Sequence, residues 1–198
     1  MNTTSVSKTV AIAGLGIMGS AIARSLVERG WTVIGFDIDA ARCAELARSG
    51  VAIAASVGQL ARDAEIVMTS LPSPAAAETV AREIAGSGAP RRIVAELSTL
   101  AIADKLRFKN ILKQAGHVAL DCPLSGTGAQ AKTRDLVVYA SGDSAAIARC
   151  MTVFADFAKQ SADLGDYGNG SRMKFVANHL VAIHNVASAV ATLWIATR

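Results

Sequence analysis

Short apolar runs alternate with longer segments of mixed polarity through the first 170 residues. The runs are nearly continuous, as in strands that are buried on both faces of a sheet. The amphipathic segments between them predict helices, several of which end at a glycine. This alternation with short loops predicts an α/β fold with a doubly wound parallel sheet. The predicted strands cover residues 10–13, 33–36, 51–54, 65–70, 93–97, 118–121, 136–140 and 161–164.

The last segment, residues 171–198, has a different pattern. Ser171 is a residue type that caps helices, and no Gly or Pro follows it, so we expect one unbroken helix of 28 residues. Apolar residues occupy much of its surface, and such a helix needs something to pack against. We therefore expect a domain at 1–170, and a helix at 171–198 that contacts a second subunit in a homo-oligomer or a continuation of the chain.

The first predicted strand leads into a glycine-rich turn, and the second strand ends at Asp37. The turn reads Gly14-Leu15-Gly16-Ile17-Met18-Gly19. Strand, glycine turn, helix, strand and acid in this order are typical of a Rossmann-type dinucleotide-binding unit. In such a unit Gly14 takes a positive φ, Gly16 lets a pyrophosphate approach the backbone, and Gly19 lets the helix pack closely on the strand. The free amides at the helix N-terminus then face the phosphates.

The carboxylate of Asp37 falls where it can bind both hydroxyls of an adenosine ribose. It would repel the 2′-phosphate of NADP, so its charge favours NAD as the cofactor over NADP, and Arg42 is the nearby cation that could reverse this preference. The alternative role for Asp37 is a helix cap. The whole stretch could also imitate a secretory signal or an ordinary tight turn. Three glycines in the apolar core, followed directly by a second strand, argue against a signal.

The composition narrows the class of protein. Of the 198 residues, 52% are hydrophobic and 18% are charged, which is typical of a globular chain. The net charge is +4, but Lys and Arg are scattered without interleaved aromatic residues, so we expect no nucleic-acid partner. No uninterrupted apolar run of about 18 residues is free of glycine and charge, so we also expect no membrane span.

The cysteines and histidines suggest neither disulfides nor a metal site. Cys43, Cys122 and Cys150 are far apart and odd in number, and the three histidines form no cluster with the spacing of metal ligands. We therefore expect reduced cysteines in a cytoplasmic protein, and no metal.

In an open parallel sheet, ligands bind at the carboxyl ends of the strands. Beyond the glycine turn, these ends carry Leu71-Pro72, Ser98-Thr99 and the segment 121–128, and Lys174 follows a glycine-rich turn. We expect these loops to converge on one crevice.

These residues resemble a known family, the β-hydroxyacid dehydrogenases, which include 3-hydroxyisobutyrate dehydrogenase and tartronate semialdehyde reductase. The matching segments are residues 14–19, 71–72, 96–99, 121–126 and 168–174, followed by Asn178. They extend in the same order over essentially the whole chain. The resemblance implies NAD(P)-dependent oxidation of a small 3-hydroxy acid, or reduction of the matching semialdehyde. Family members continue into an all-helical domain that closes the site and forms the dimer, so the chain resembles their N-terminal part.

The resemblance assigns the catalytic lysine to Lys174 and its accompanying asparagine to Asn178. Four residues apart on a helix, these side chains share one face and can reach one substrate hydroxyl. Lys174 would take the alcohol proton while hydride leaves the same carbon. Because free lysine has a pKa of about 10.4, this role requires a lowered pKa. The plainer interpretation of Lys174 is a solvated surface charge.

In the same family, Ser125 and the backbone of Gly126 and Thr127 match a loop that binds the substrate carboxylate. A glycine pair is usual after the serine, so Thr127 is a departure. It would narrow the pocket and add a hydroxyl, which suggests a more polar substrate. The plainer interpretation is an ordinary Ser-Gly turn.

Thr99 matches a contact on the nicotinamide side, and Leu71 and Pro72 match the lining of the adenosine and pyrophosphate region. Their alternatives are a helix cap for Ser98 or Thr99 and a strand stop at Pro72.

The functional alternatives also stay open. The chain could be a dinucleotide-binding module without catalysis, or a truncated and weakly active fragment. An imine reductase on the same scaffold is disfavoured, because such enzymes usually replace the lysine.

Overall fold

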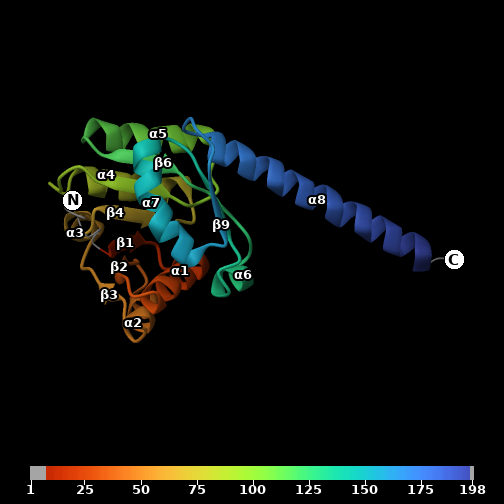
Figure 1. The fold of residues 1–198 in the computed structure, drawn as a ribbon, viewed down its shortest axis with the longest axis horizontal. Coiled ribbons are helices and arrows are strands. Elements are labelled where there is room, and N and C mark those ends of the chain that lie inside the picture. The colour runs from red at the N-terminus through yellow and green to blue at the C-terminus, as the bar shows by residue number, and fades with distance from the viewer. Residues whose placement is uncertain (1–7, 197–198) are drawn as a thin grey trace, which may run out of the picture.

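The computed structural model describes residues 8–196, which contain a six-stranded parallel sheet in the order β3-β2-β1-β4-β5-β6 (Figure 1). The strands are β1 (Thr9–Ala13), β2 (Thr32–Phe36), β3 (Ala52–Ile53), β4 (Ile66–Thr69), β5 (Ile93–Glu96) and β6 (Val118–Asp121). The strand order reverses between β1 and β4, which is the topology that binds dinucleotides at the carboxyl edge. The predicted doubly wound sheet is confirmed.

Helices cover both faces of this sheet. They are α1 (Ile17–Glu28), α2 (Ala40–Ala47), α3 (Val57–Asp63), α4 (Pro74–Ala85), α5 (Ile102–Gln114) and α7 (Ser144–Phe157). Two further helices are α6 (Gly128–Lys132), which packs against α1, and α8 (Asn169–Ala196). Side chains of Asp39 and Ser56 cap α2 and α3. Neither Ser98 nor Thr99 caps α5, because that helix begins after Ala101 without a side-chain cap.

The central strands are buried on both faces, as their continuous apolar runs predict. Alternate residues of one strand enter different parts of the core because successive side chains point to opposite faces. On β4, Met68 packs with the core cluster that contains residues of α1 and α7, whereas Val67 packs with the cluster that contains residues of α3, α4 and α5. The two core layers thus cover opposite faces of the sheet.

The strands predicted at 136–140 and 161–164 do not join the main sheet. They are β8 (Val137–Ala140) and β9 (Gln160–Asp163), which form a second sheet with the short β7 (Leu124–Ser125), in the order β7-β8-β9. Only two residues separate β6 from β7, too few for the crossover that a parallel partner requires. The chain therefore turns back, and β7 pairs antiparallel with β8.

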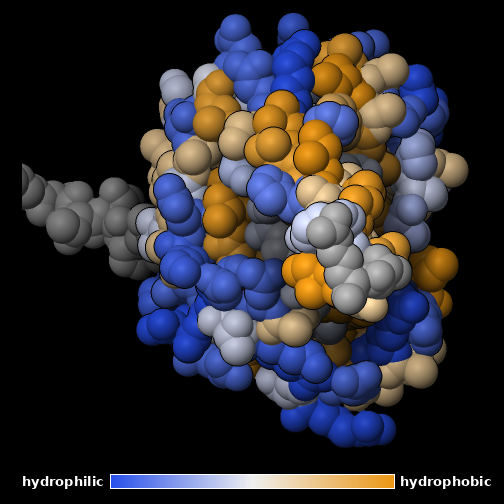
Figure 2. All heavy atoms as spheres, turned by 90° about the vertical axis from the view of Figure 1, so that its right-hand side faces the viewer, coloured by the Kyte–Doolittle hydropathy of each residue, from blue (hydrophilic) through white to orange (hydrophobic). Residues whose placement is uncertain are grey.

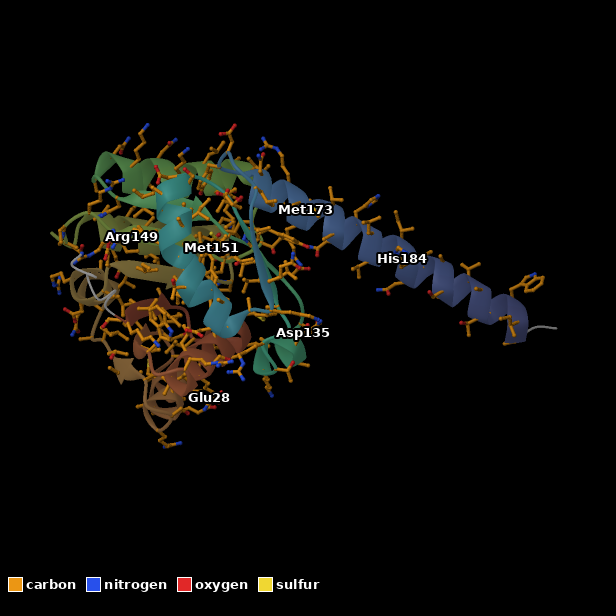
Figure 3. The ribbon with its side chains drawn as sticks, viewed as in Figure 1. Glu28, Asp135, Arg149, Met151, Met173 and His184 are labelled. Atoms are coloured by element: carbon orange, nitrogen blue, oxygen red, sulfur yellow. The ribbon has the colours of Figure 1, made fainter. Side chains whose placement is uncertain are left out.

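Helix α8 begins at Asn169, two residues before the expected start, so Ser171 lies inside its first turn and is not the cap. Beyond that turn the helix projects away from the rest of the molecule (Figure 1), and its side chains around His184 extend into open space (Figure 3). Large apolar side chains between Phe175 and Ile195 are 39–70% exposed. Figure 2 faces the side from which α8 projects and shows hydrophobic residues near its centre with hydrophilic ones at the rim.

Of the described helices, α8 alone is long and apolar enough to cross a membrane, judged by length and composition. Single polar residues such as Asn178 and His184 interrupt its apolar run, and nothing tests the sequence expectation of no membrane span. That expectation stays a prediction.

Candidate active site

The glycine turn has the geometry that its sequence predicts. Gly14 has a φ of +93°, and a Cβ there would lie 2.2 Å from the carbonyl oxygen of Ser70. A Cβ on Gly19 would lie 1.9 Å from the carbonyl oxygen of Gly14, so α1 can approach β1 only with glycine at this position. At Gly16, the nearest atom to an added Cβ is Nη1 of Arg42 at 3.9 Å. The backbone at Gly16 is therefore open to a ligand, and α1 starts just after it without a side-chain cap.

Asp37 lies at the end of β2 with its side chain 6% exposed. Its carboxylate accepts hydrogen bonds from the amides of Leu15 (2.7 Å) and Asp39 (2.9 Å), and Nη1 of Arg42 lies 3.5 Å away. The helix cap is Asp39, not Asp37, because the Asp39 side chain binds the amide of Ala41. A carboxylate offers about four lone-pair positions, so Asp37 can hold the glycine turn and still accept further hydrogen bonds.

A cavity of about 620 Å³ opens between the glycine turn, the end of β2 and α4. A volume of that size is in the range of cofactor pockets. It unites seven residues predicted for the cofactor: Gly14, Gly16, Ile17, Met18, Asp37, Leu71 and Pro72. Ile17 is 77% exposed at its edge, which leaves an apolar surface for a ligand to cover.

A second cavity, of about 270 Å³, adjoins the first, and both are lined by Met18, Ser70 and Leu71. Its other lining residues are Leu97, Ser98, Thr99, Leu124, Gly126 and Lys174. The structure thus brings Thr99, Gly126 and Lys174 together although they lie far apart in the sequence. Ser125, Thr127 and Asn178 are not among the residues that line this cavity.

Lys174 is half-buried at this second cavity, and burial lowers its pKa. No other residue lining the cavity carries an ionisable side chain. Lys174 is therefore only partly solvated. A lysine with a lowered pKa can exchange a proton nearer to neutral pH.

Thr127 has a structural role in its own loop. Its hydroxyl accepts from the amide of Gln130, and the Gln130 side chain accepts from the amide of Thr127, which is a capping box for α6. Before it, Gly126 has a φ of +135°, and a Cβ there would lie 2.6 Å from Leu136. Asn178 is exposed on α8. Substrate contacts by Thr127 and Asn178 stay predictions.

Known proteins share this arrangement. Residues 9–167 match the family described as the NAD binding domain of 6-phosphogluconate dehydrogenase. The chain belongs to this family. The solved structure of 3-hydroxyisobutyrate dehydrogenase from Mycobacterium tuberculosis with L-serine is 27% identical and has a TM-score of 0.89, covering 94% of this chain and 64% of that one.

Two relatives are named for oxidoreductase activities. The probable 3-hydroxyisobutyrate dehydrogenase of Mycobacterium tuberculosis is 27% identical over 183 residues, 92% of this chain and 62% of that protein. The 3-sulfolactaldehyde reductase of Escherichia coli is 27% identical over 190 residues, 93% of this chain and 63% of that protein. The resemblance predicted from the motifs is confirmed, and the chain spans less than two thirds of the length of these relatives.

A buried cluster of charges, which sequence reasoning missed, is hydrogen-bonded through Glu96 to Ser98 in the wall of the second cavity. Glu96 and Asp121 end the adjacent strands β5 and β6 and are paired across them. The ammonium of Lys105 contacts a carboxylate oxygen of Glu96 and lies 3.0 Å from Oδ1 of Asp121, and all three side chains are 0% exposed. The available signal was two carboxylates ending adjacent buried strands, because such charges require a cation nearby.

Among residues 8–196, no three or more His, Cys, Asp or Glu side chains form a group that could hold a metal ion. Cys122 and Cys150 are buried as free thiols. Burial raises the pKa of Cys150 to about 12 and that of Cys122 well above its ordinary value, so both act as small hydrophobic side chains at neutral pH.

The Lys105 cluster makes the free energy of unfolding depend on pH in the alkaline range. Burial alone would lower the pKa of Lys105, but attraction by Glu96 and then Asp121 outweighs burial and raises it. A raised folded-state pKa stabilises the protein below the unfolded-state value of about 10.4, and this contribution is lost as pH rises through the folded-state pKa.

We expect Lys105→Met to lower the free energy of unfolding by about 3–5 kcal/mol at pH 8, because it leaves two buried carboxylates without their cation. Urea denaturation of both proteins from pH 8 to pH 11 measures this, and the difference should shrink at the alkaline end. Lys132→Met, at an exposed position of α6, is the control. A constant difference across this range would show that the charge of Lys105 is not its cause.

Proposed function

We propose that this chain binds NAD and carries the general acid/base of an oxidoreductase that acts on a small 3-hydroxy acid or its semialdehyde. The observation that carries the proposal is the position of Lys174. It lines a cavity that shares Met18, Ser70 and Leu71 with the larger cavity over the glycine turn. A proton-transfer group thus lies next to the place where a dinucleotide would end.

The cofactor would be held by the residues around the larger cavity. The open backbone at Gly16 and the free amides at the start of α1 suit a pyrophosphate, and Asp37 suits a ribose. A bound dinucleotide supplies the hydride acceptor or donor at its nicotinamide ring. Leu71 and Pro72 line this cavity, as expected for residues that contact the adenosine and pyrophosphate of the cofactor.

Lys174 would do the proton chemistry. In the oxidation, its neutral Nζ accepts the proton of the substrate hydroxyl, and in the reduction the ammonium returns it. Its lowered pKa enlarges the fraction of neutral amine near physiological pH. The exposed backbone of Gly126, with Ser125 and Thr127 beside it, would hold a substrate carboxylate. The amide of Thr127 is already bonded to Gln130.

We expect Lys174→Ala to reduce hydride transfer by a factor on the order of 10²–10⁴, since general acid/base catalysis contributes that much. Binding of NADH, followed by its fluorescence, should remain unchanged. Lys132→Ala is the matched control at an exposed lysine. The assay is NAD reduction at 340 nm with a panel of small 3-hydroxy acids, and undiminished turnover by Lys174→Ala would refute the assignment.

A second candidate is a dinucleotide-binding module without catalysis. The exposed position of Asn178 favours it, because acid/base catalysis generally needs a site from which water is excluded. The same experiments separate the two candidates. NADH binding without turnover of any panel member by the native protein supports the module.

We expect the protein to bind NAD more tightly than NADP, because the carboxylate of Asp37 repels a 2′-phosphate. Arg42 is also held by Asp39, at 3.4 Å, so it neutralises Asp37 only in part. Asp37→Asn should tighten NADP binding by roughly tenfold, and Arg42→Ala should weaken it. Isothermal titration with both cofactors measures these changes, and tighter binding of NADP by the native protein would contradict the preference.

We also propose that two copies associate through α8, as a way to cover its exposed apolar side chains. Val186 and Val190 lie four residues apart on one face and are 65% and 60% exposed. Replacing both by Lys should convert a dimer to a monomer in sedimentation velocity, whereas Leu106→Lys on α5 should not. A monomeric native protein, or one that sediments with liposomes instead, would overturn this proposal.

A further inference from the structure

The charge cluster of Lys105, Glu96 and Asp121 is connected to the walls of the second cavity. Glu96 extends toward two of its loops: Oε1 accepts from the amide of Ser98 at 2.9 Å, and the hydroxyl of Ser98 accepts from the amide of Leu71 at 2.8 Å. Ser98 and Leu71 both line the cavity that contains Lys174.

Asp121 extends toward the helix that carries Lys174. Its Oδ2 accepts from the amide of Ser171 and its Oδ1 from the hydroxyl of Ser171, both at 2.8 Å. Because Ser171 lies in the first turn of α8, the buried carboxylate binds an otherwise unpaired amide at the positive end of that helix. Lys174 follows three residues later, on the same face.

The start of α8 is also packed closely onto the sheet. The hydroxyl of Ser141 accepts from the amides of Gly168 (3.2 Å) and Gly170 (3.0 Å) and lies 3.2 Å from the carbonyl oxygen of Asp121. A Cβ on Gly170 would lie 2.3 Å from the carbonyl oxygen of Tyr139. Within α8, Gly170 and Ser171 are the buried residues, so the direction of this 28-residue helix is set at its first turn.

We propose that Asp121, Lys105 and Ser171 are positioning residues that hold the Nζ of Lys174 over the second cavity. The inference rests on the proposed function of Lys174. A helix fixed at one end amplifies a small displacement of its first turn, and a displacement of 1 Å at a reacting group costs about 10²-fold in rate. Lys105 acts indirectly, because its ammonium holds the Asp121 carboxylate that accepts the hydrogen bonds of Ser171.

The test compares Ser171→Ala, Asp121→Asn and the double variant in the full chain. We expect Ser171→Ala to lower kcat by about tenfold to a hundredfold, with KM for NAD unchanged. The double variant should be no worse than the more affected single variant, because both changes break one interaction. Ser25→Ala, which removes a buried hydroxyl from α1, is the control.

A second measurement does not depend on turnover. The pH midpoint for acylation of Lys174 by acetic anhydride, read by mass spectrometry with Lys132 as internal reference, reports its surroundings. Ser171→Ala should shift this midpoint upward, because the amine loses the burial that lowers its pKa. If the native chain has no dehydrogenase activity, the proposed function fails, yet this shift still tests the positioning.

Two results would overturn the proposal. One is a folded Ser171→Ala protein whose kcat and labelling midpoint both equal those of the native chain. The other is a loss of NADH affinity and thermal stability that accounts for the whole fall in rate, because this would mark Ser171 as merely structural.

Discussion

One ammonium group without access to water holds the carboxyl edge of the sheet together. Lys105 lies between Glu96 and Asp121, and each carboxylate continues into hydrogen bonds with backbone amides of a loop or a helix. Burying such charges costs several kcal/mol per ion, so the cluster adds little net stability compared with an apolar core. Its effect is specificity of arrangement, because each oxygen has a required partner.

The glycine turn and the charge cluster lie at the same edge of the sheet and hold its elements together in different ways. At the turn, the absence of side chains lets β1, α1 and the loop after β4 approach within distances that no Cβ would allow. At the cluster, charged side chains join β5 and β6 to α5 and to the first turn of α8. Two adjoining cavities open at this edge. One is lined by the glycine turn and Asp37 among apolar side chains, and the other by the half-buried Lys174.

Helix α8 starts at this edge of the sheet and extends away from the rest of the molecule. Its first turn is buried and hydrogen-bonded, whereas the remainder presents apolar side chains in every direction. Relatives such as the Escherichia coli 3-sulfolactaldehyde reductase are longer than the segment matched here. The proposed catalytic lysine lies between the anchored and the uncovered parts of this helix, so both parts affect its environment.

The sequence alone was sufficient for the longer elements and for the dinucleotide turn, because those signals are local, whereas the short β7 and α6 were not predicted. Continuous apolar runs predicted the six parallel strands, and Gly14, Gly16 and Gly19 act through their own backbone. Caps at Asp39 and Ser56 need only the next few residues. Resemblance to known motifs added Lys174 and Thr99, which the fold brings to one cavity.

Tertiary structure decided what depends on partners far apart in the sequence. Ser171 has the side chain of a helix cap, yet it binds Asp121, fifty residues away, because a buried carboxylate competes for its hydroxyl. The runs at 136–140 and 161–164 predicted strands correctly but could not show that a two-residue connection places them in a second sheet. Nothing in the sequence singled out Lys105, since only the fold shows that two carboxylates meet beside it and that all three side chains are buried.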